Sequence, residues 1–451
     1  MTPSSRRNLS DSPPWVRLGI LFLTVFVDLV GFGIVLPLLP LYADRFGASG
    51  TEIGILVLSY SAAQLLLAPI WGQLSDRFGR RPILIIGLVG SALSYLVFAY
   101  AGSLLVLLLS RIMAGVGGAN IPVAQAYIAD ITPPHRRAGN MGLIGAAFGL
   151  GFIFGPAIGG LLAPVAPELP GLTAAGLCLS NALLAVFLLP ESLSPSEREA
   201  RAARATDMQP GLALTSRAGG IRSRLEDLRV TLRSPQFFHV VVMSFIFTTA
   251  FSIMHPTFPL FAAQRFGLDA RAVGWLFAFT GVVSAVMQGG LVRLIVARTG
   301  EVTLIRLSAV PFVAGFLVMA VAGSVPMLLL GLGLLAMGFG GTLPSLVSLL
   351  SQHAPDEVQG GSLGIGQSAG AMARIVGPFM AGVIWDTMGM SWPYFVAAAI
   401  GAVAGLWGLR LQPPPGPDSR AQGDTLRHSS SRRVRDSVRV PLDLRPGSPN
   451  P

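Results

Sequence analysis

Long apolar runs dominate the chain and recur at nearly regular intervals along it. Each run is continuous, rich in Leu, Ala, Gly and Val, and close to the roughly 20 residues that a helix needs to cross a bilayer core. Strands of a membrane barrel would instead show short segments of alternating polarity. The pattern therefore predicts twelve membrane-spanning helices, at 17–42, 52–73, 82–100, 103–129, 138–163, 171–190, 236–262, 272–296, 302–323, 325–350, 360–386 and 391–411.

One polar, arginine-rich segment separates two groups of six spans, and another follows the last span. The segment 191–235 carries apolar residues at helical spacing between positions 221 and 232, which predicts a short interfacial helix. The segment after 411 is rich in Pro, Ser and Arg, a composition typical of disorder. The predicted parts are a cytoplasmic N-terminus, a six-helix bundle, a cytoplasmic linker, a second six-helix bundle and a cytoplasmic tail: 1–16, 17–190, 191–235, 236–411 and 412–451.

The two groups of spans resemble each other. "PLLPLYADRFG" (37–47) returns as "PTFPLFAAQRFG" (256–267), and "GPAIGG" (155–160) returns as "GPFMAG" (377–382). Such a repeat indicates two bundles of the same topology. In folds of this kind the substrate site lies near the membrane midplane, between the bundles.

Charge is sparse, and its position predicts the orientation. Only 12% of the residues are charged, against about 25% in a soluble domain. All 32 basic residues are arginine, and most fall in segments that the alternation of spans places on the inside. Three lie in outside loops (Arg45, Arg265 and Arg271), two lie deep within spans (Arg111 and Arg374), and the others lie in inside segments or near the inner ends of spans. The positive-inside rule therefore puts both termini in the cytoplasm, and topology rather than nucleic acid accounts for the net charge of +10.

The sequence lacks the residues of an enzyme site. Cys178 is the single cysteine, the histidines form no H-x-x-x-H pair, and a phosphate loop needs a lysine that the chain does not have. "GQSAG" (366–370) has the letters of a nucleophile elbow but lies in an apolar helix with no strand before it. We expect no enzyme activity, metal site or cofactor, and a proton gradient as the energy source.

One acidic residue, Asp28, lies inside the first apolar run, "FVDLVGFGIVLPLLP" (26–40). At 1.5 Å per residue from Arg17, it lies about 16 Å deep, near the midplane. An ionised side chain there costs about 2.5–3.5 kcal/mol on insertion scales, and protonation removes most of that cost. Asp28 is therefore a candidate proton carrier or counter-ion of a cationic substrate. The alternative is a neutral carboxyl group hydrogen-bonded between helices.

The strongest motif is "GQLSDRFGRR" (72–81), at the end of the second span. Its glycines allow close helix approach and a tight turn. Its acid is placed to meet a helix N-terminus or a cation, and its arginines to meet carboxylates or helix C-termini. Topology alone does not require this spacing. We predict a cytoplasmic gate made of Gly72, Asp76, Arg77, Gly79, Arg80 and Arg81.

This segment resembles the loop 2–3 signature of the major facilitator superfamily. "SRIMAGVGGA" (110–119) resembles the superfamily's helix 4 motif, and "GFIFGPAIGG" (151–160) resembles the helix 5 motif associated with antiporters. "VDLVGFGIVLPLLP" (27–40) resembles the helix 1 motif of the twelve-helix drug:proton antiporter branch. The run "APIWGQLSDRFGRRPILIIGLVGSALSYL" looks like that of tetracycline-efflux-type transporters. The similarity covers roughly residues 17–411, with the motifs in the family's order.

The resemblance implies an all-α polytopic membrane protein, with twelve helices in two six-helix bundles, in the cell inner membrane. It implies a proton-coupled antiporter that exports a drug-like or lipophilic small molecule by alternating access, as in multidrug efflux and antibiotic resistance. Its partners would be the substrate, protons and the lipid bilayer, and we expect a monomer. A proton-coupled importer and a transporter-like ligand sensor remain as alternatives.

The resemblance also implies roles for single residues. Arg111 would couple transport to protons together with Asp28, Arg80 would pair with Asp130, and Asp76 would face the start of helix 11. Four glycines and a proline of helix 5 would pack closely and seal that helix against helix 8. The alternative is helix packing alone, because glycine allows close packing in any membrane bundle. The glycines and the proline are Gly151, Gly155, Pro156, Gly159 and Gly160.

Polar side chains within the spans are candidates for the substrate cavity, with ordinary interhelical bonding as the alternative for each: Gln64, Asn120, Gln125, Tyr127, His255, Gln288, Gln367 and Arg374. Arg374 would recognise an anionic group or pair with a residue of helix 2. Where tetracycline exporters carry an acid or a histidine, this chain has Ser94, Ser284 and Phe312. A tetracycline–cation chelate needs such groups, so a broader or more lipophilic substrate fits better.

Overall fold

The computed structural model describes residues 13–118, 120–193, 196, 198, 235–353 and 359–413. In these ranges the chain is nearly all helical, and twelve helices are long and apolar enough to cross a membrane. The predicted number of spans is thereby confirmed. Most of the predicted linker and tail, including the predicted interfacial helix, lies outside the described residues.

The first half of the chain forms six spans, two of which are interrupted. Pro37 lacks the N–H that a continuous helix needs, and the first span breaks there into two helices. The fourth span is likewise made of two helices, α5 and α6. The elements are α1 (Pro14–Val35), α2 (Leu38–Arg45), α3 (Gly50–Phe78), α4 (Arg80–Ala99), α5 (Leu104–Gly117), α6 (Asn120–Ile131), α7 (Pro134–Leu162) and α8 (Leu169–Leu188).

The second half repeats the six spans with different irregularities. Its second span contains one π-helical turn, η2, around the pair Gly289 and Gly290. The last span ends in a short 3-10 turn, η4. The elements are α11 (Pro235–Phe266), α12 (Ala270–Val286), η2 (Met287–Leu291), α13 (Val292–Thr299), α14 (Glu301–Ala320), α15 (Val325–His353), α16 (Gln359–Met388), α17 (Trp392–Trp407) and η4 (Gly408–Arg410).

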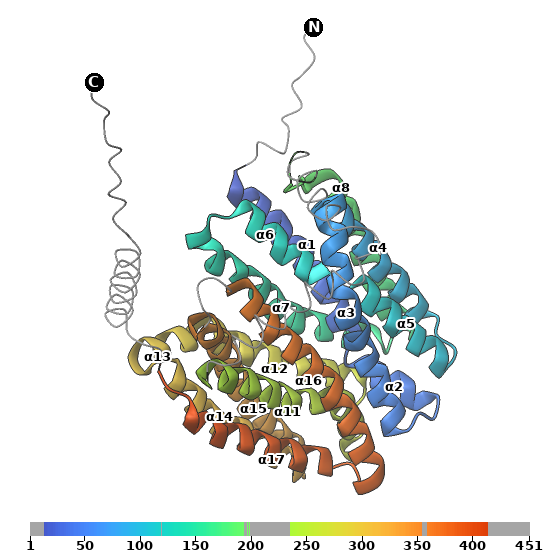
Figure 1. Ribbon diagram of the computed structural model, residues 1–451. Helices are drawn as coiled ribbons and strands as arrows, with labels where there is room; N and C mark the ends of the chain where they lie inside the picture. Colours follow the sequence, from blue (N-terminus) through green and yellow to red (C-terminus); the bar gives the residue numbers. More distant parts are fainter. Residues whose placement is uncertain are drawn as a thin grey trace, which may run out of the picture. The chain divides into compact units, whose positions relative to one another are not determined.

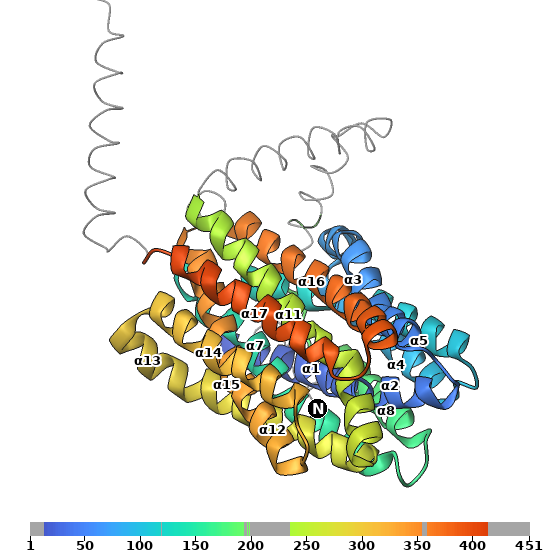
Figure 2. The same ribbon diagram turned by 90° about the horizontal axis from the view of Figure 1, so that it is seen from below.

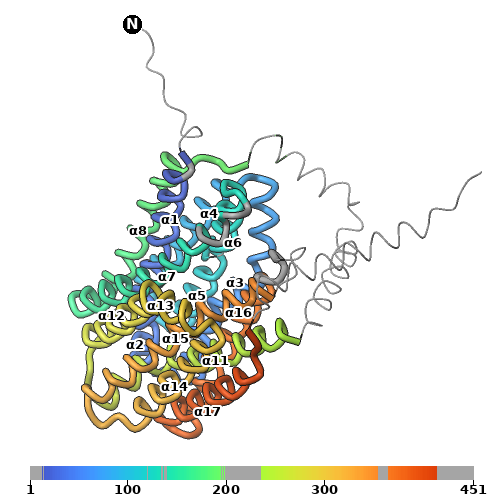
Figure 3. Tube along the Cα trace, turned by 90° about the vertical axis from the view of Figure 1, so that its left-hand side faces the viewer, coloured from blue at the N-terminus to red at the C-terminus, as the bar shows by residue number. Residues whose placement is uncertain are grey.

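The helices of each half gather together, as the blue-to-green ribbons of the first half and the yellow-green-to-red ribbons of the second half show in Figure 1. The tube of Figure 3 shows the same grouping from another side. Within the first half α1 packs on α7 and α8, and within the second half α14 packs on α15 and α17. The halves meet chiefly through two helix pairs, α3 with α16 and α7 with α12. The first of these pairs can be followed in Figure 2.

Glycines let the backbones of α1 and α7 touch. A β-carbon built on Gly155 would lie 2.6 Å from the backbone of Gly33, and one built on Gly33 would lie 2.7 Å from the carbonyl oxygen of Gly151. Gly159 meets the same helix, at the carbonyl of Ile34. Small residues are the usual means of such close approach in membranes, where helices gain little from burying apolar surface.

The predicted glycine set of helix 5 is therefore divided between two neighbours. Gly151, Gly155 and Gly159 face α1 of their own half, and not α12 as expected for a seal between helices 5 and 8. The other two members do meet α12, where a β-carbon on Gly274 would lie 2.5 Å from the carbonyl oxygen of Pro156 and 2.7 Å from the Cα of Gly160.

The first prediction concerns this packing. Gly155→Val should lower the thermal unfolding midpoint of the detergent-purified protein, because the new side chain meets the backbone of α1, which cannot move aside; overpacking of this kind costs about 1–3 kcal/mol. Gly149→Val on the same helix is the control, since a β-carbon there meets nothing within 4 Å. Equal midpoints for the two variants would contradict the close α1–α7 contact.

Candidate functional site

Asp28 lies on α1 among neutral polar groups of the first half. The Sγ of Cys178 on α8 is 3.9 Å from its Oδ1, and Ser91 on α4 and Asn120 on α6 lie beside the carboxylate. Among the described residues no basic side chain forms an ion pair with it. The surroundings thus supply hydrogen bonds without a fixed counter-charge, as a group that binds and releases a proton requires.

Arg111 lies on α5 and is only 3% exposed. Its Nε donates a 3.4 Å hydrogen bond to Ser110, and its guanidinium lies 5.2 Å from the ring centre of Phe98. Its Nη2 is buried and has no hydrogen-bond partner within the described part of the chain. The structure does not join Arg111 to Asp28 in an ion pair, so a role in proton coupling stays a prediction.

A central cavity of about 60 Å³ lies between the two halves. The first half contributes Phe32 of α1, Tyr60 of α3 and Arg111 of α5 to its wall. The second half contributes Ser252, His255 and Arg374, from α11 and α16. Of the eight cavity candidates, His255 and Arg374 thus line it.

Two of the other candidates form ordinary interhelical hydrogen bonds. The amide of Gln64 donates to the carbonyl of Gly118 at 2.9 Å. Tyr127 is fully buried and donates its hydroxyl to the carbonyl of Pro190 at 2.7 Å. In this conformation Gln64 and Tyr127 therefore form ordinary structural hydrogen bonds and do not line the cavity. Four more candidates do not line the cavity: Asn120, Gln125, Gln288 and Gln367.

Tyr60 and Ser252 are cavity residues that the sequence did not single out. A tyrosine or a serine in an apolar helix is common, and nothing in its neighbours along the chain marks it. The internal repeat aligns whole helices and thus indicates where two bundles meet, but not which side chains point inward.

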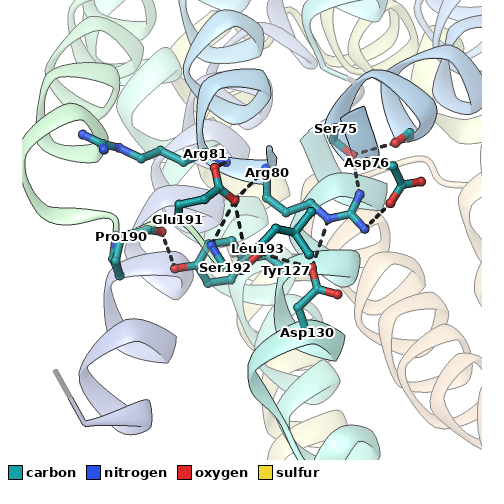
Figure 4. A network of polar contacts seen from close by, with 11 residues as sticks. Ser75, Asp76, Arg80, Arg81, Tyr127, Asp130, Pro190, Glu191, Ser192 and Leu193 are labelled. Atoms are coloured by element: carbon teal, nitrogen blue, oxygen red, sulfur yellow. Dashed lines mark hydrogen bonds and ion pairs between the residues drawn. The ribbon is translucent and has the colours of Figure 1, made fainter. Parts of the chain in front are cut away.

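The predicted gate motif forms a polar network at the junction of α3 and α4 (Figure 4). Arg80 is 4% exposed, and its guanidinium lies 2.6 Å from Asp76 and 3.1 Å from Asp130 of α6. It also donates to the hydroxyl of Ser75 at 2.5 Å. The pair between Arg80 and Asp130 is the one that the resemblance implied. The expected contact of Asp76 with the start of helix 11 involves side chains outside the described set.

A second acid, Glu191, completes this network. Its carboxylate accepts from the backbone N–H groups of Arg80 at 2.9 Å and Arg81 at 3.2 Å, and so caps the N-terminus of α4 (Figure 4). The chain reverses at Gly79 with φ of 105°, a conformation that favours glycine, and a β-carbon there would overlap the carboxylate. Glu191 could have been suspected from the sequence, because it is the acid that directly follows the sixth span.

The remaining gate candidates contribute less in this conformation. Arg77 is exposed, with its guanidinium 5.4 Å from the ring centre of Phe78. A β-carbon on Gly72 would meet nothing within 4 Å, so the close helix approach expected there is not present among the described residues. Arg81 donates to the carbonyl of Val186 on α8.

The opposite end of α3 is tied to the other half of the molecule. Asp386, near the end of α16, accepts from the backbone N–H groups of Gly50 at 2.7 Å and Thr51 at 2.8 Å, and from the Thr51 hydroxyl at 2.6 Å. A carboxylate at a helix N-terminus satisfies amides that lack a partner inside the helix. We call these contacts the Asp386 latch.

Twelve membrane-spanning helices in two bundles around a shared cavity are the architecture of a multi-pass membrane transporter. The profile of the Major Facilitator Superfamily matches residues 21–371 and 294–444, and the chain belongs to this family. Membership of a transporter family indicates a transporter rather than an enzyme.

Individual relatives span most of the chain. Multidrug resistance protein 2 of Bacillus subtilis is 28% identical over 84% of this chain and 91% of its own length. Tetracycline resistance protein, class C, of Escherichia coli is 32% identical over 84% of this chain and 92% of its own length. The crystal structure of the human organic anion transporter MFSD10 (TETRAN) matches with a TM-score of 0.66 and 25% identity, over 88% of this chain and all of that one.

The second prediction concerns the gate network. Arg80→Ala should destabilise the protein by about 3 kcal/mol, because it removes the buried partner of Asp130, which is 12% exposed, whereas Asp76 is 46% exposed and can bond water. Arg77→Ala removes the same charge from an exposed site three residues away and should change the unfolding midpoint little. Comparable midpoints for both variants in detergent would show that the network of Arg80 does not stabilise the fold.

The third prediction concerns the Asp386 latch. Asp386→Ala should favour separation of α3 from α16 at this end by about 1 kcal/mol, or roughly fivefold in population, the usual value of a helix cap. Spin labels on cysteines introduced at Asp44 and Met388 would report a larger share of long distances. Thr387→Ala is the control, since its hydroxyl bonds only within α16, to Val383. An unchanged distance distribution in Asp386→Ala would contradict the latch.

Proposed function

We propose that the protein is a proton-coupled exporter of small, lipophilic molecules that works by alternating access in the cell inner membrane, with both termini in the cytoplasm. The observation that carries the proposal is Asp28, an acid within a membrane span that is surrounded by neutral polar groups. Such a group can be neutral in one conformation and ionised in another at modest cost, which is what proton coupling needs.

The family and the distribution of arginine support the remaining parts of the proposal. Relatives whose names describe multidrug and tetracycline resistance favour export of drug-like molecules. The positive-inside rule favours cytoplasmic termini. The proton gradient supplies the energy without a cofactor, and the transporter acts as a monomer with a substrate path between its two bundles. Import remains the alternative direction, which the sidedness of transport distinguishes.

The fourth prediction tests Asp28. In everted membrane vesicles, wild-type protein should drive uptake of an uncharged lipophilic dye such as Nile red when a proton gradient is applied, and Asp28→Asn should lower the initial rate at least tenfold. The reason is that an amide cannot take up and release the proton. The retained size and hydrogen-bonding capacity of Asn separate this loss from a packing defect.

Asp44→Asn, at an exposed acid of α2, is the matched control and should transport at the wild-type rate. Gradient-driven uptake by Asp28→Asn at the wild-type rate would overturn the role of Asp28. Uptake only in right-side-out vesicles would favour the importer, and binding of dye without flux in either orientation would favour the ligand sensor.

A further inference from the structure

Two arginines from different halves of the molecule share one cavity. Arg111 comes from α5 of the first bundle and Arg374 from α16 of the second, and both line the central cavity together with Tyr60 and Ser252. Each lies within a membrane-spanning helix. A guanidinium in such a place is costly unless it is paired, coordinated by backbone carbonyls or exposed to a water-filled space.

The described residues do not neutralise these two cations. Neither arginine has an ion-pair partner among them, since both ion pairs in the described part of the chain belong to Arg80. Arg374 makes no hydrogen bond there, and Arg111 makes one to the hydroxyl of Ser110. Asp28, the acidic residue within the span formed by α1, instead lies beside Ser91, Asn120 and Cys178. The cavity therefore carries net positive charge.

Unused hydrogen-bond donors point to the same place. The Nη2 of Arg111 is buried without a partner, and so is the hydroxyl of Ser252, which is 1% exposed. Buried polar atoms are nearly always satisfied, so donors in the wall of a cavity are suited to an acceptor that enters it. Here two such donors, one from each bundle, lie in the wall of one cavity, beside a second guanidinium.

We propose that this cavity binds the anionic group of an amphipathic substrate, a carboxylate or a sulfonate, between Arg111 and Arg374. The proposal rests on the transporter function proposed above and names its substrate class. Guanidinium groups are suited to this task, because their planar fork of donors matches the oxygens of a carboxylate. The hydroxyl of Ser252 supplies a further donor from the second bundle.

The dimensions of the cavity fit a headgroup rather than a whole molecule in this conformation. A volume of about 60 Å³ is enough for a few water molecules or for one carboxylate. Drug-sized ligands need pockets of about 300 Å³ or more, so the apolar body of the substrate requires the bundles to move apart. The wall beside the arginines includes Phe32, Val57 and Phe152, which suits an aromatic or aliphatic body.

The test compares anions with neutral molecules of the same shape. Purified full-length protein would be titrated with 2-naphthoate and naphthalene-2-sulfonate, and with the neutral 2-naphthamide and naphthalene-2-sulfonamide, at fixed pH and without a proton gradient. Wild-type protein should bind each anion at least tenfold more tightly than its neutral counterpart. Arg374→Gln and Arg111→Gln should each reduce this preference about tenfold, the usual effect of losing a charge-assisted hydrogen bond.

Three further variants separate recognition from general effects. Arg374→Lys keeps the charge and should retain part of the preference. Ser252→Ala removes one donor and should weaken anion binding about threefold, with no effect on the amides. Arg293→Gln removes a charge from an exposed site of α13 and should bind as wild type. A size-exclusion profile like that of wild type establishes that each variant is folded.

Equal binding of anions and neutral analogues by wild-type protein would overturn the proposal, and so would an unchanged preference in folded Arg374→Gln and Ser252→Ala. Because binding is measured without a gradient, these outcomes are independent of the transport test. Loss of the anion preference with intact proton-driven dye uptake refutes the anion site alone. An intact anion preference without gradient-driven flux refutes the proposed function and leaves the site standing.

Discussion

Desolvation of charge is the constraint on which this molecule depends. An ionised side chain away from water must be paired or must face a space that a ligand or water can enter. Arg80 meets the first condition, with two carboxylates and a hydroxyl around one guanidinium. Arg111 and Arg374 meet the second, at the wall of a cavity. The same residue type thus stabilises the fold at one site and is available for binding at another.

Helix α3 joins these features. It has 29 residues, which corresponds to about 43 Å, and the Asp386 latch holds one end while the Arg80 network lies at the other. The described partners of Arg80 all belong to the first half, whereas Asp386 belongs to the second. A ligand can shift a conformational equilibrium only by its difference in affinity between two states. Contacts that join the two bundles must therefore cost little free energy to break. The Asp386 latch meets this condition, because a helix cap contributes only about 1 kcal/mol.

The sequence predicted the twelve spans because hydrocarbon length and backbone satisfaction leave a strong pattern in each span. It also led to the pair of Arg80 with Asp130, but only because the motif at 72–81 resembles a family signature, since Asp130 lies 50 residues further along the chain. It did not predict which helix each glycine of α7 meets, since all faces of a membrane helix are apolar and small residues serve any of them. Tyr127 shows the same limit: an inward polar side chain can be a cavity residue or a hydrogen-bond donor to Pro190, and only the neighbouring helix decides.

The placement of the two cavity arginines on different bundles has a mechanical consequence. Two like charges in a poorly hydrated space repel each other, so bringing the bundles together around an empty cavity is opposed. An anion bound between them, as proposed above, would remove this repulsion and attract both sides, and it would therefore favour the conformations in which the bundles approach. Asp28 lies on α1, which also lines the cavity through Phe32, so a change in its charge alters the potential at the same place. Proton and anion would then act on one equilibrium through electrostatics, without a chain of mechanical contacts between their sites.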